Sequence, residues 1–162
     1  MSRDSAFRVL LVCTGNTCRS PMAEAIMRNA LAERGVTEIT VDSAGTGAFE
    51  GSPASEGAYL VALEHGLDLS AHRAQRLSAE LVGKSDLILT MSAHHRDRVI
   101  DEGGLGKVHL LGTYAGRKGE DAVVNDPYGA SLDEYRITYD ELDRLITAAI
   151  GRLEAERSDG QR

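Results

Sequence analysis

Short apolar segments alternate with helical patterns along nearly the whole chain, and this alternation restricts the fold more than any other feature of the sequence. The first apolar segment, Phe7–Cys13, is rich in strand formers and is bounded by Gly15, as is typical of a buried parallel strand. The next segment predicts a helix over residues 20–34, because Pro21 lies in its first turn and Gly35 follows its end. A strand that leads directly into a helix is the unit from which parallel α/β sheets are built.

The remaining segments repeat this pattern. Further strands are expected over residues 38–43, 86–91 and 107–111, and further helices over 54–65, 78–84 and 94–102. The last helix begins at a capping box formed by Ser131 and Glu134 and carries one apolar stripe. Residues 158–162 are expected to form a frayed polar tail. The sequence therefore predicts one α/β domain over residues 1–162, with a four-stranded parallel sheet flanked by helices.

The composition argues against several classes of protein. A formal net charge of −7 does not suit a nucleic-acid-binding protein, which needs a basic face to meet the phosphate backbone. No apolar run approaches the roughly 20 residues of a membrane span, so no membrane partner is expected. No signal peptide is expected either. The 2 cysteines can form neither a disulfide framework nor, alone, a four-ligand zinc site. We therefore expect a cytoplasmic protein with no cofactor and no metal.

The junction between the first strand and the first helix, Cys13–Ser20, carries the chemistry. Ligands of parallel sheets bind at the carboxyl ends of strands, and backbone N–H groups at a helix start form a site for anions. Gly15 permits the tight turn, and the planar guanidinium of Arg19 can hold two phosphate oxygens. The same positive field favours the thiolate form of Cys13, which can attack phosphorus. This pattern indicates a phosphate-binding loop with a cysteine nucleophile.

The segment VCTGNTCRSPMAE resembles the signature of the low-molecular-weight protein tyrosine phosphatases. The resemblance continues along nearly the whole chain, through residues 42–45, 70–74 and 126–128, which lie where the later motifs of that family lie. It implies a four-stranded parallel sheet, in agreement with the segment pattern. Within the family the chain looks closest to the bacterial protein-arginine phosphatases, which share the Thr-Gly-Asn-Thr loop and an acidic Asp-Pro-aromatic-Gly loop.

The resemblance assigns roles to individual residues. Cys13 is the expected nucleophile, which passes through a phosphocysteine intermediate, and Arg19 is the expected phosphate ligand. Asp126 is the expected general acid for the leaving group and then the base that activates water. The Ser20 hydroxyl is expected to donate a hydrogen bond to the thiolate. The other residues of the phosphate-binding loop are Thr14, Gly15, Asn16, Thr17 and Cys18.

Other residues are expected around this loop. Asn16, Ser43 and His72 match residues that, in the family, hold this loop in place by hydrogen bonds. Asn16 is also expected to adopt a left-handed backbone conformation. Phe49 and Tyr128 are expected to flank the substrate. Two alternatives remain open: Phe49 as a packing anchor for its loop, and Tyr128 as an ordinary surface residue.

Two further features have competing interpretations. Cys18 is either a small buried residue or the partner of Cys13 in a reversible disulfide that protects the nucleophile from over-oxidation. His94 and His95 suggest a metal site at first sight. Neighbouring helix residues diverge by about 100°, however, and no third ligand is near, so both are expected at the surface.

Four functions are compatible with a loop of this general kind. The glycine motif of a nucleotide-binding loop is absent from this segment, which argues against that function. A phosphoprotein-binding module without activity has no need for the combination of Cys13, Arg19 and Asp126. A thiol-dependent arsenate reductase uses downstream cysteines, and none follows Cys18. A phosphatase of phosphorylated proteins remains, acting as a monomer or weak dimer. Thr17 favours phosphoarginine, because its hydroxyl can meet a guanidinium N–H, and phosphotyrosine is the alternative.

Overall fold

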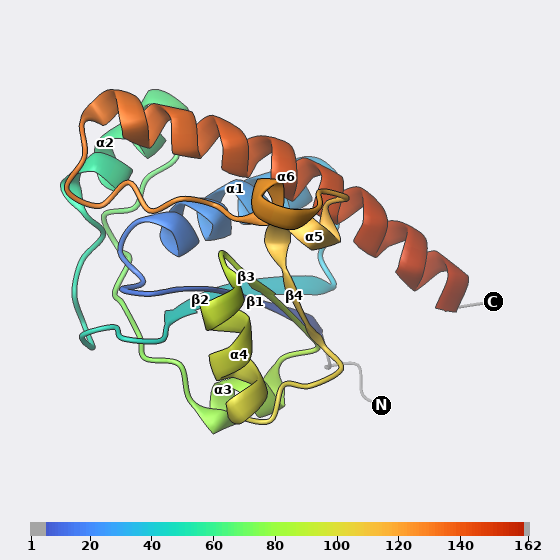
Figure 1. Cartoon of the computed structure of the whole chain (residues 1–162). Helices are drawn as coiled ribbons and strands as arrows, with labels where there is room; N and C mark the ends of the chain where they lie inside the picture. The colour runs from blue at the N-terminus through green and yellow to red at the C-terminus, as the bar shows by residue number, and fades with distance from the viewer. Residues whose placement is uncertain (1–5, 161–162) are drawn as a thin grey trace.

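Four parallel strands form the centre of the computed structural model, which describes residues 6–160 (Figure 1). The strands are β1 (Phe7–Cys13), β2 (Ile39–Gly45), β3 (Leu87–Thr90) and β4 (Val108–Leu110), in the order β2-β1-β3-β4. β1 is central, and its last residues pair with both neighbours: Cys13 lies opposite Gly45, and Val12 opposite Thr90. The predicted α/β class with a four-stranded parallel sheet is confirmed.

Helices cover both faces of this sheet. They are α1 (Arg19–Glu33), α2 (Glu56–Glu64), α3 (Ala79–Lys84), α4 (Ala93–Asp101), α5 (Leu111–Tyr114) and α6 (Leu132–Gly160), with a 3-10 turn η1 (Gly119–Ala122). Figure 1 shows α1, α2, α5 and α6 on one face, and α3 and α4 on the other. The sequence did not predict α5 and η1, because their glycines read as loop. Among residues 6–160, no helix combines the length and the apolar character that crossing a membrane requires.

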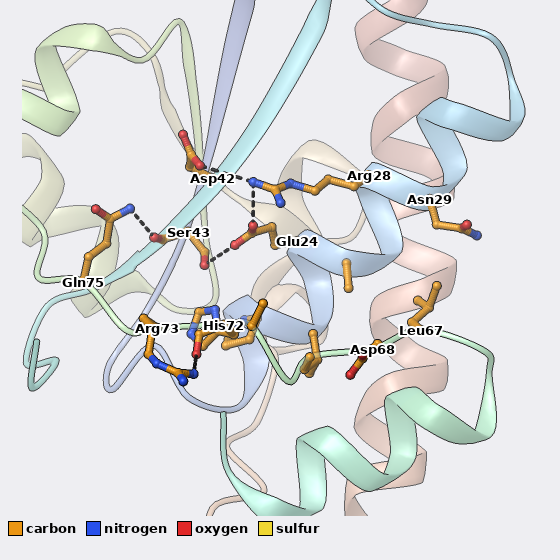
Figure 2. A pocket seen from close by; sticks show the side chains of 14 residues that line it. Glu24, Arg28, Asn29, Asp42, Ser43, Leu67, Asp68, His72, Arg73 and Gln75 are labelled. Atoms are coloured by element: carbon orange, nitrogen blue, oxygen red, sulfur yellow. Dashed lines mark hydrogen bonds and ion pairs between the residues drawn. The ribbon is translucent and has the colours of Figure 1, made fainter. Parts of the chain in front are cut away.

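β2 extends further than predicted and thereby shapes the edge of the sheet beside the loop that follows β1. It continues two residues beyond Ser43, because its pairing with β1 persists to the end of both strands. Gly45 makes this possible: a Cβ there would lie 2.4 Å from the Thr14 carbonyl oxygen, so only glycine allows the loop after β1 to approach β2. Ser43 consequently lies beside the first turns of α1 (Figure 2).

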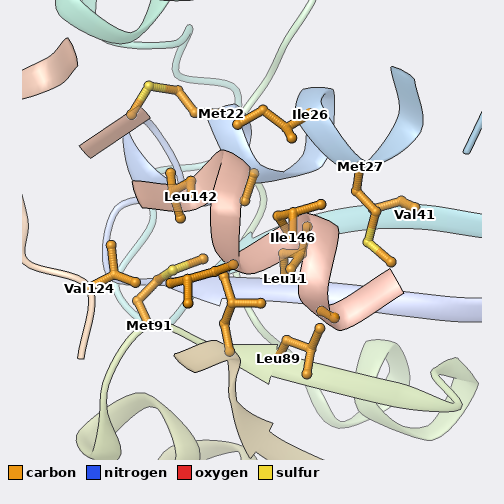
Figure 3. Close-up of a cluster of buried hydrophobic side chains, with 14 of the residues drawn as sticks. Leu11, Met22, Ile26, Met27, Val41, Leu89, Met91, Val124, Leu142 and Ile146 are labelled. Atoms are coloured by element: carbon orange, nitrogen blue, oxygen red, sulfur yellow. The ribbon is translucent and has the colours of Figure 1, made fainter. Parts of the chain in front are cut away.

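The core follows from the two buried faces of β1. Leu11 points toward the α1 and α6 layer, where it belongs to one apolar cluster with Met22, Leu142 and Ile146 (Figure 3). The alternate residues of β1, Leu10 and Val12, belong to a smaller cluster with Val82 of α3 and Val99 of α4. A strand buried on both faces needs a continuous apolar run, and this explains why β1 shows no polar alternation.

The C-terminal helix is longer than expected. Ser131 Oγ accepts a hydrogen bond from the Glu134 backbone N–H at 3.3 Å, so the predicted cap is formed on its serine side. The predicted frayed tail is not seen over residues 158–160, because α6 continues through Gly160. The Arg157 guanidinium lies 4.6 Å from the centre of the Phe7 ring, and this contact holds the last turns of α6 against β1. The end of the predicted tail, residues 161–162, lies outside the described residues.

Candidate active site

The loop between β1 and α1 lies at the carboxyl edge of the sheet and is held in shape by Asn16. This residue is fully buried and has φ 56°, the left-handed conformation expected from the sequence. Its Nδ2 donates to Ser20 Oγ at 2.8 Å and to Ser43 Oγ at 2.9 Å. Its Oδ1 accepts from the Gln75 backbone N–H at 2.9 Å, and its carbonyl oxygen lies 2.7 Å from His72 Nε2. The structure thus brings Asn16, Ser43 and His72 together.

The network ends at a carboxylate, that of Glu24. Ser43 Oγ donates to Glu24 Oε1 at 2.6 Å, because an ionised carboxylate only accepts (Figure 2). The Ser43 oxygen is then left to accept from Asn16. Glu24 is itself paired with Arg28 at 2.8 Å, four residues along α1. Glu24 was not among the residues expected from the sequence, although its place one turn after Ser20 on α1 was a usable signal.

Arg19 is the first residue of α1 and is only 5% exposed. Its Nη1 donates to the Val124 carbonyl oxygen at 2.9 Å, and its Nη2 lies 3.5 Å from Thr14 Oγ1 and 3.6 Å from Asp126 Oδ2. Its buried Nε has no hydrogen-bond partner within the described residues. An unsatisfied buried donor costs about 1–3 kcal/mol, which an anion bound along the Nε–Nη2 edge would recover.

The backbone of the loop offers further donors to the same anion. Within residues 6–160, the N–H groups of residues 14–18 donate to no other protein group. These N–H groups belong to a loop that opens directly into α1, where the partial positive charge of the helix N-terminus adds to that of Arg19. The loop and Arg19 together therefore form a site for a tetrahedral oxyanion.

This site opens into a pocket of about 470 Å³. Cys13 and Arg19 lie in its lining, and Asp126 lines it from the loop before α6, with its side chain 46% exposed. Phe49 and Tyr128 also line it and are 82% and 72% exposed. The alternative in which Phe49 anchors its loop by packing is therefore wrong, because most of the ring contacts no protein. The remaining lining residues are Thr14, Gly15, Thr17, Cys18, Gly47, Ser52, Pro53, Ala54 and Ser55.

A second pocket, of about 520 Å³, lies behind the loop (Figure 2). Its lining includes Glu24, Arg28, Ser43 and His72, which belong to the hydrogen-bond network that supports the loop or lie beside it. Neither cysteine lines it. We therefore assign the reacting groups to the first pocket.

The prediction that His95 lies at the surface is wrong. His95 is 0% exposed, and its Nε2 lies 2.8 Å from Thr14 Oγ1 while its Nδ1 lies 3.0 Å from Ser92 Oγ. Burial, followed by the positive charge of Arg19 and a smaller electrostatic contribution from His94, lowers the pKa of His95 to about 3, so the ring is neutral. His94 is exposed, as predicted. The usable signal was the position of His95 just after a strand that neighbours β1.

Cys18 is buried and has its own hydrogen-bond partners. Its Sγ lies 3.2 Å from Ser55 Oγ and 3.3 Å from the Tyr135 hydroxyl. Burial, together with the hydrogen bond to Cys18, raises the pKa of Tyr135 to about 12. Cys13 and Cys18 are both free thiols. The reversible disulfide between them stays a prediction.

A cysteine at the end of the central parallel strand, beside a buried arginine with a free donor edge, defines the class of cysteine-dependent phosphatases. A family model described as "Low molecular weight phosphotyrosine protein phosphatase" matches residues 8–159. The chain therefore belongs to the low-molecular-weight protein tyrosine phosphatase family, and it is a cysteine-dependent protein phosphatase.

Individual relatives agree with this assignment. The chain is similar to the protein-arginine-phosphatase of Geobacillus stearothermophilus, with 36% identity over 151 residues that cover 93% of this chain and 99% of the relative. It is similar to the low-molecular-weight protein-tyrosine-phosphatase Wzb of Escherichia coli K12 to the same degree, 36% over 151 residues, covering 92% and 97%. Among solved structures, a mutant of YwlE from Bacillus subtilis aligns with a TM-score of 0.85 and 34% identity, covering 92% and 99%.

Proposed function

We propose that this enzyme hydrolyses phosphoarginine in proteins through a phosphocysteine intermediate on Cys13, with phosphotyrosine as the alternative substrate. The observation that carries the proposal is the buried Arg19, which lines the same pocket as Cys13 and whose Nε has no hydrogen-bond partner among residues 6–160. A group with several equatorial oxygens is the natural ligand of such an arginine and of the loop N–H groups.

The first step transfers the phosphoryl group to sulfur. The Cys13 thiolate attacks phosphorus, an S–P bond forms, and the bond from phosphorus to the substrate nitrogen or oxygen breaks. Ser20 stabilises the thiolate, because its Oγ lies 2.9 Å from Cys13 Sγ. Asp126 gives its proton to the departing atom. Phosphate oxygens compete with Asp126 for Nη2 of Arg19, which frees the carboxyl group for this task.

The second step hydrolyses the intermediate. Asp126, now a carboxylate, removes a proton from a water molecule, and the water oxygen attacks phosphorus. The S–P bond breaks, inorganic phosphate leaves, and the thiolate of Cys13 is restored. Arg19 and the loop N–H groups stabilise the equatorial oxygens in both steps, since the same atoms carry the charge in each transition state.

Thr17 supports phosphoarginine over phosphotyrosine. It lines the pocket beside Cys13, with its hydroxyl oxygen 3.7 Å from Cys18 Sγ. A hydroxyl can accept a hydrogen bond from a guanidinium N–H, whereas a phenyl ring gains more from an apolar neighbour. The exposed rings of Phe49 and Tyr128 do not separate the substrates, because a guanidinium and a phenyl ring both stack on aromatic faces. The relative named as a protein-arginine-phosphatase and the relative named as a protein-tyrosine-phosphatase are both 36% identical to this chain, so sequence identity does not choose between the substrates.

The deciding experiment compares two peptides of one sequence, one carrying phosphoarginine and the other phosphotyrosine, and measures kcat/KM for each. We expect the phosphoarginine peptide to be turned over more efficiently. A higher kcat/KM on phosphotyrosine would replace our assignment by the alternative. A nucleophilic Cys13 needs a reducing environment, so we also propose a cytoplasmic enzyme, acting as a monomer or weak dimer on phosphorylated proteins.

A further inference from the structure

A buried histidine contacts the phosphate-binding loop directly behind the nucleophile. His95 comes from the first turn of α4, and its Nε2 lies 2.8 Å from the hydroxyl of Thr14, the residue that follows Cys13. The mechanism above does not use His95. His95 is fully buried and titratable, and it lies within two hydrogen bonds of Arg19.

The chemistry of the partners orients the protons. Arg19 can only donate, so Thr14 Oγ1 accepts from its Nη2, which lies 3.5 Å away. The Thr14 proton is then available to His95 Nε2. The opposite ring nitrogen can donate to Ser92 Oγ at 3.0 Å, and the Ser92 proton can go to His94 Nδ1 at 2.8 Å. In this arrangement every proton has an acceptor.

We propose that His95 is a positioning residue for phosphoryl transfer: its neutral imidazole holds the Thr14 hydroxyl, which in turn holds Nη2 of Arg19. The guanidinium then has a protein contact at each of its two terminal nitrogens. Nη1 is bound by the Val124 carbonyl oxygen at 2.9 Å, and Nη2 is held through Thr14. Among residues 6–160, Nε then has no protein partner and is available to phosphate oxygens. The proposal rests on the roles proposed above for Cys13 and Arg19.

The burial of His95 keeps the ring in the form that this role requires. A protonated imidazole has two donors and no acceptor, so it could not take the Thr14 proton. It would also place a second positive charge next to Arg19. The lowered pKa of about 3 means that the ring stays neutral throughout the physiological range.

The test is a double-mutant cycle between His95 and Thr14. His95→Leu should lower kcat about tenfold and change KM less than about threefold. A tenfold loss is the lower end of the effect seen when residues that hydrogen-bond to metal ligands are mutated, and His95 supports Arg19 in a similar indirect way. Thr14→Val removes the hydroxyl and keeps the shape, and it should lower kcat to a similar extent. In the Thr14→Val background, His95→Leu should cost less than about twofold more, because the contact through which it acts is already gone.

Controls separate this role from a merely structural one. His95→Gln retains an amide near the position of Nε2 and should restore at least a third of the lost kcat. His94→Leu, which shares the Ser92 contact but not the Thr14 contact, should leave kcat within about twofold. Thr14 is exposed, so Thr14→Val should fold even if His95→Leu does not.

The anion affinity distinguishes failure of this proposal from failure of the proposed function. The same four proteins of the cycle are titrated with inorganic phosphate and with orthovanadate, which needs no turnover. We expect His95→Leu to weaken the binding of vanadate more than the binding of phosphate. This difference should appear only when Thr14 is present. Additive losses in the cycle, or a Thr14→Val enzyme within twofold of wild type, would overturn the role of His95. A wild-type enzyme that binds both anions but hydrolyses no phosphopeptide would instead overturn the proposed function.

Discussion

The Ser20 hydroxyl lies 2.9 Å from the Cys13 sulfur, and the hydrogen bonds around Ser20 leave its proton free for that sulfur. The direction follows from the rest of the network. Asn16 Nδ2 donates to the same serine oxygen at 2.8 Å, so the hydroxyl has its proton left for Cys13. Glu24 fixes the far end, because its carboxylate takes the proton of Ser43. The Gln75 backbone N–H fixes the orientation of the Asn16 amide, so Asn16 Nδ2 donates to Ser20 and leaves the Ser20 proton for the Cys13 sulfur.

Replacement of the proposed nucleophile should separate catalysis from binding. Cys13→Ser should lower kcat to below about a tenth of the wild-type value, because a hydroxyl is a far poorer nucleophile than a thiolate. The affinity for inorganic phosphate should change little, because Arg19 and the loop N–H groups remain. Steady-state kinetics and calorimetric titration with phosphate measure the two quantities. Substantial residual turnover would exclude Cys13 as the nucleophile.

The effect of replacing the proposed general acid should depend on the leaving group of the substrate. Asp126→Asn should lower kcat strongly on phosphopeptides, whose departing atom needs a proton, and less on para-nitrophenyl phosphate. The backbone of the loop should survive, because the amide can still accept the 3.1 Å hydrogen bond from the Tyr128 N–H. Leaving-group dependence of kcat in the two proteins is the measurement. Equal losses on good and poor leaving groups would show that Asp126 is structural.

Oxidation should be reversible only while Cys18 is present. Peroxide should inactivate the wild-type enzyme, and a thiol reductant should restore it, through a disulfide between Cys13 and Cys18. The sulfur of Cys18 must leave Ser55 and Tyr135, its present partners, to form that bond. Cys18→Ser should therefore lose activity irreversibly. Mass spectrometry that finds sulfinic acid on Cys13 of the oxidised wild type, and no bridge, would contradict this prediction.

Substitution of Thr17 should change the substrate preference. Thr17→Ile removes a hydroxyl and adds hydrocarbon, so it should weaken contacts with a guanidinium and improve those with a phenyl ring. A lost hydrogen bond to a charged group costs about 1.5–3 kcal/mol, so the ratio of kcat/KM should shift toward phosphotyrosine at least about tenfold. Matched peptides provide the measurement. A ratio that stays within about threefold would make Thr17 a bystander.

Acid should destabilise the wild-type enzyme through His95. The folded-state pKa of about 3 lies below the ordinary value of 6.5, so the unfolded chain binds more protons between these limits. The contribution of His95 to stability is complete above pH 6.5 and falls as the pH decreases toward 3. His95→Gln should escape this loss, which reaches at most about 2 kcal/mol at pH 5. Denaturant unfolding at pH 7 and pH 5 tests it, and parallel losses in both proteins would refute it.

Local features of the chain predicted much of the site. The strand, the glycine turn and the helix start follow one another directly, so the phosphate-binding loop could be placed from sequence. Asp126 was different, because the Asp-Pro dipeptide alone indicates only a turn, and the family resemblance supplied its role. The error at His95 came from treating α4 in isolation. A helix position cannot be assigned to surface or core without knowing which strand end lies beside it.

The sequence by itself determined the α/β class, the identity of the loop and the nature of its chemistry, because these depend on the order of residues along a short stretch. Only the tertiary structure decided which distant groups support that loop. The register of β1 against β2 places Ser43 beside Asn16, and the pairing of β1 with β3 brings His95 to Thr14. Hydrogen bonds have a range of about 3 Å, so partners separated by tens of residues are selected by strand pairing and helix packing.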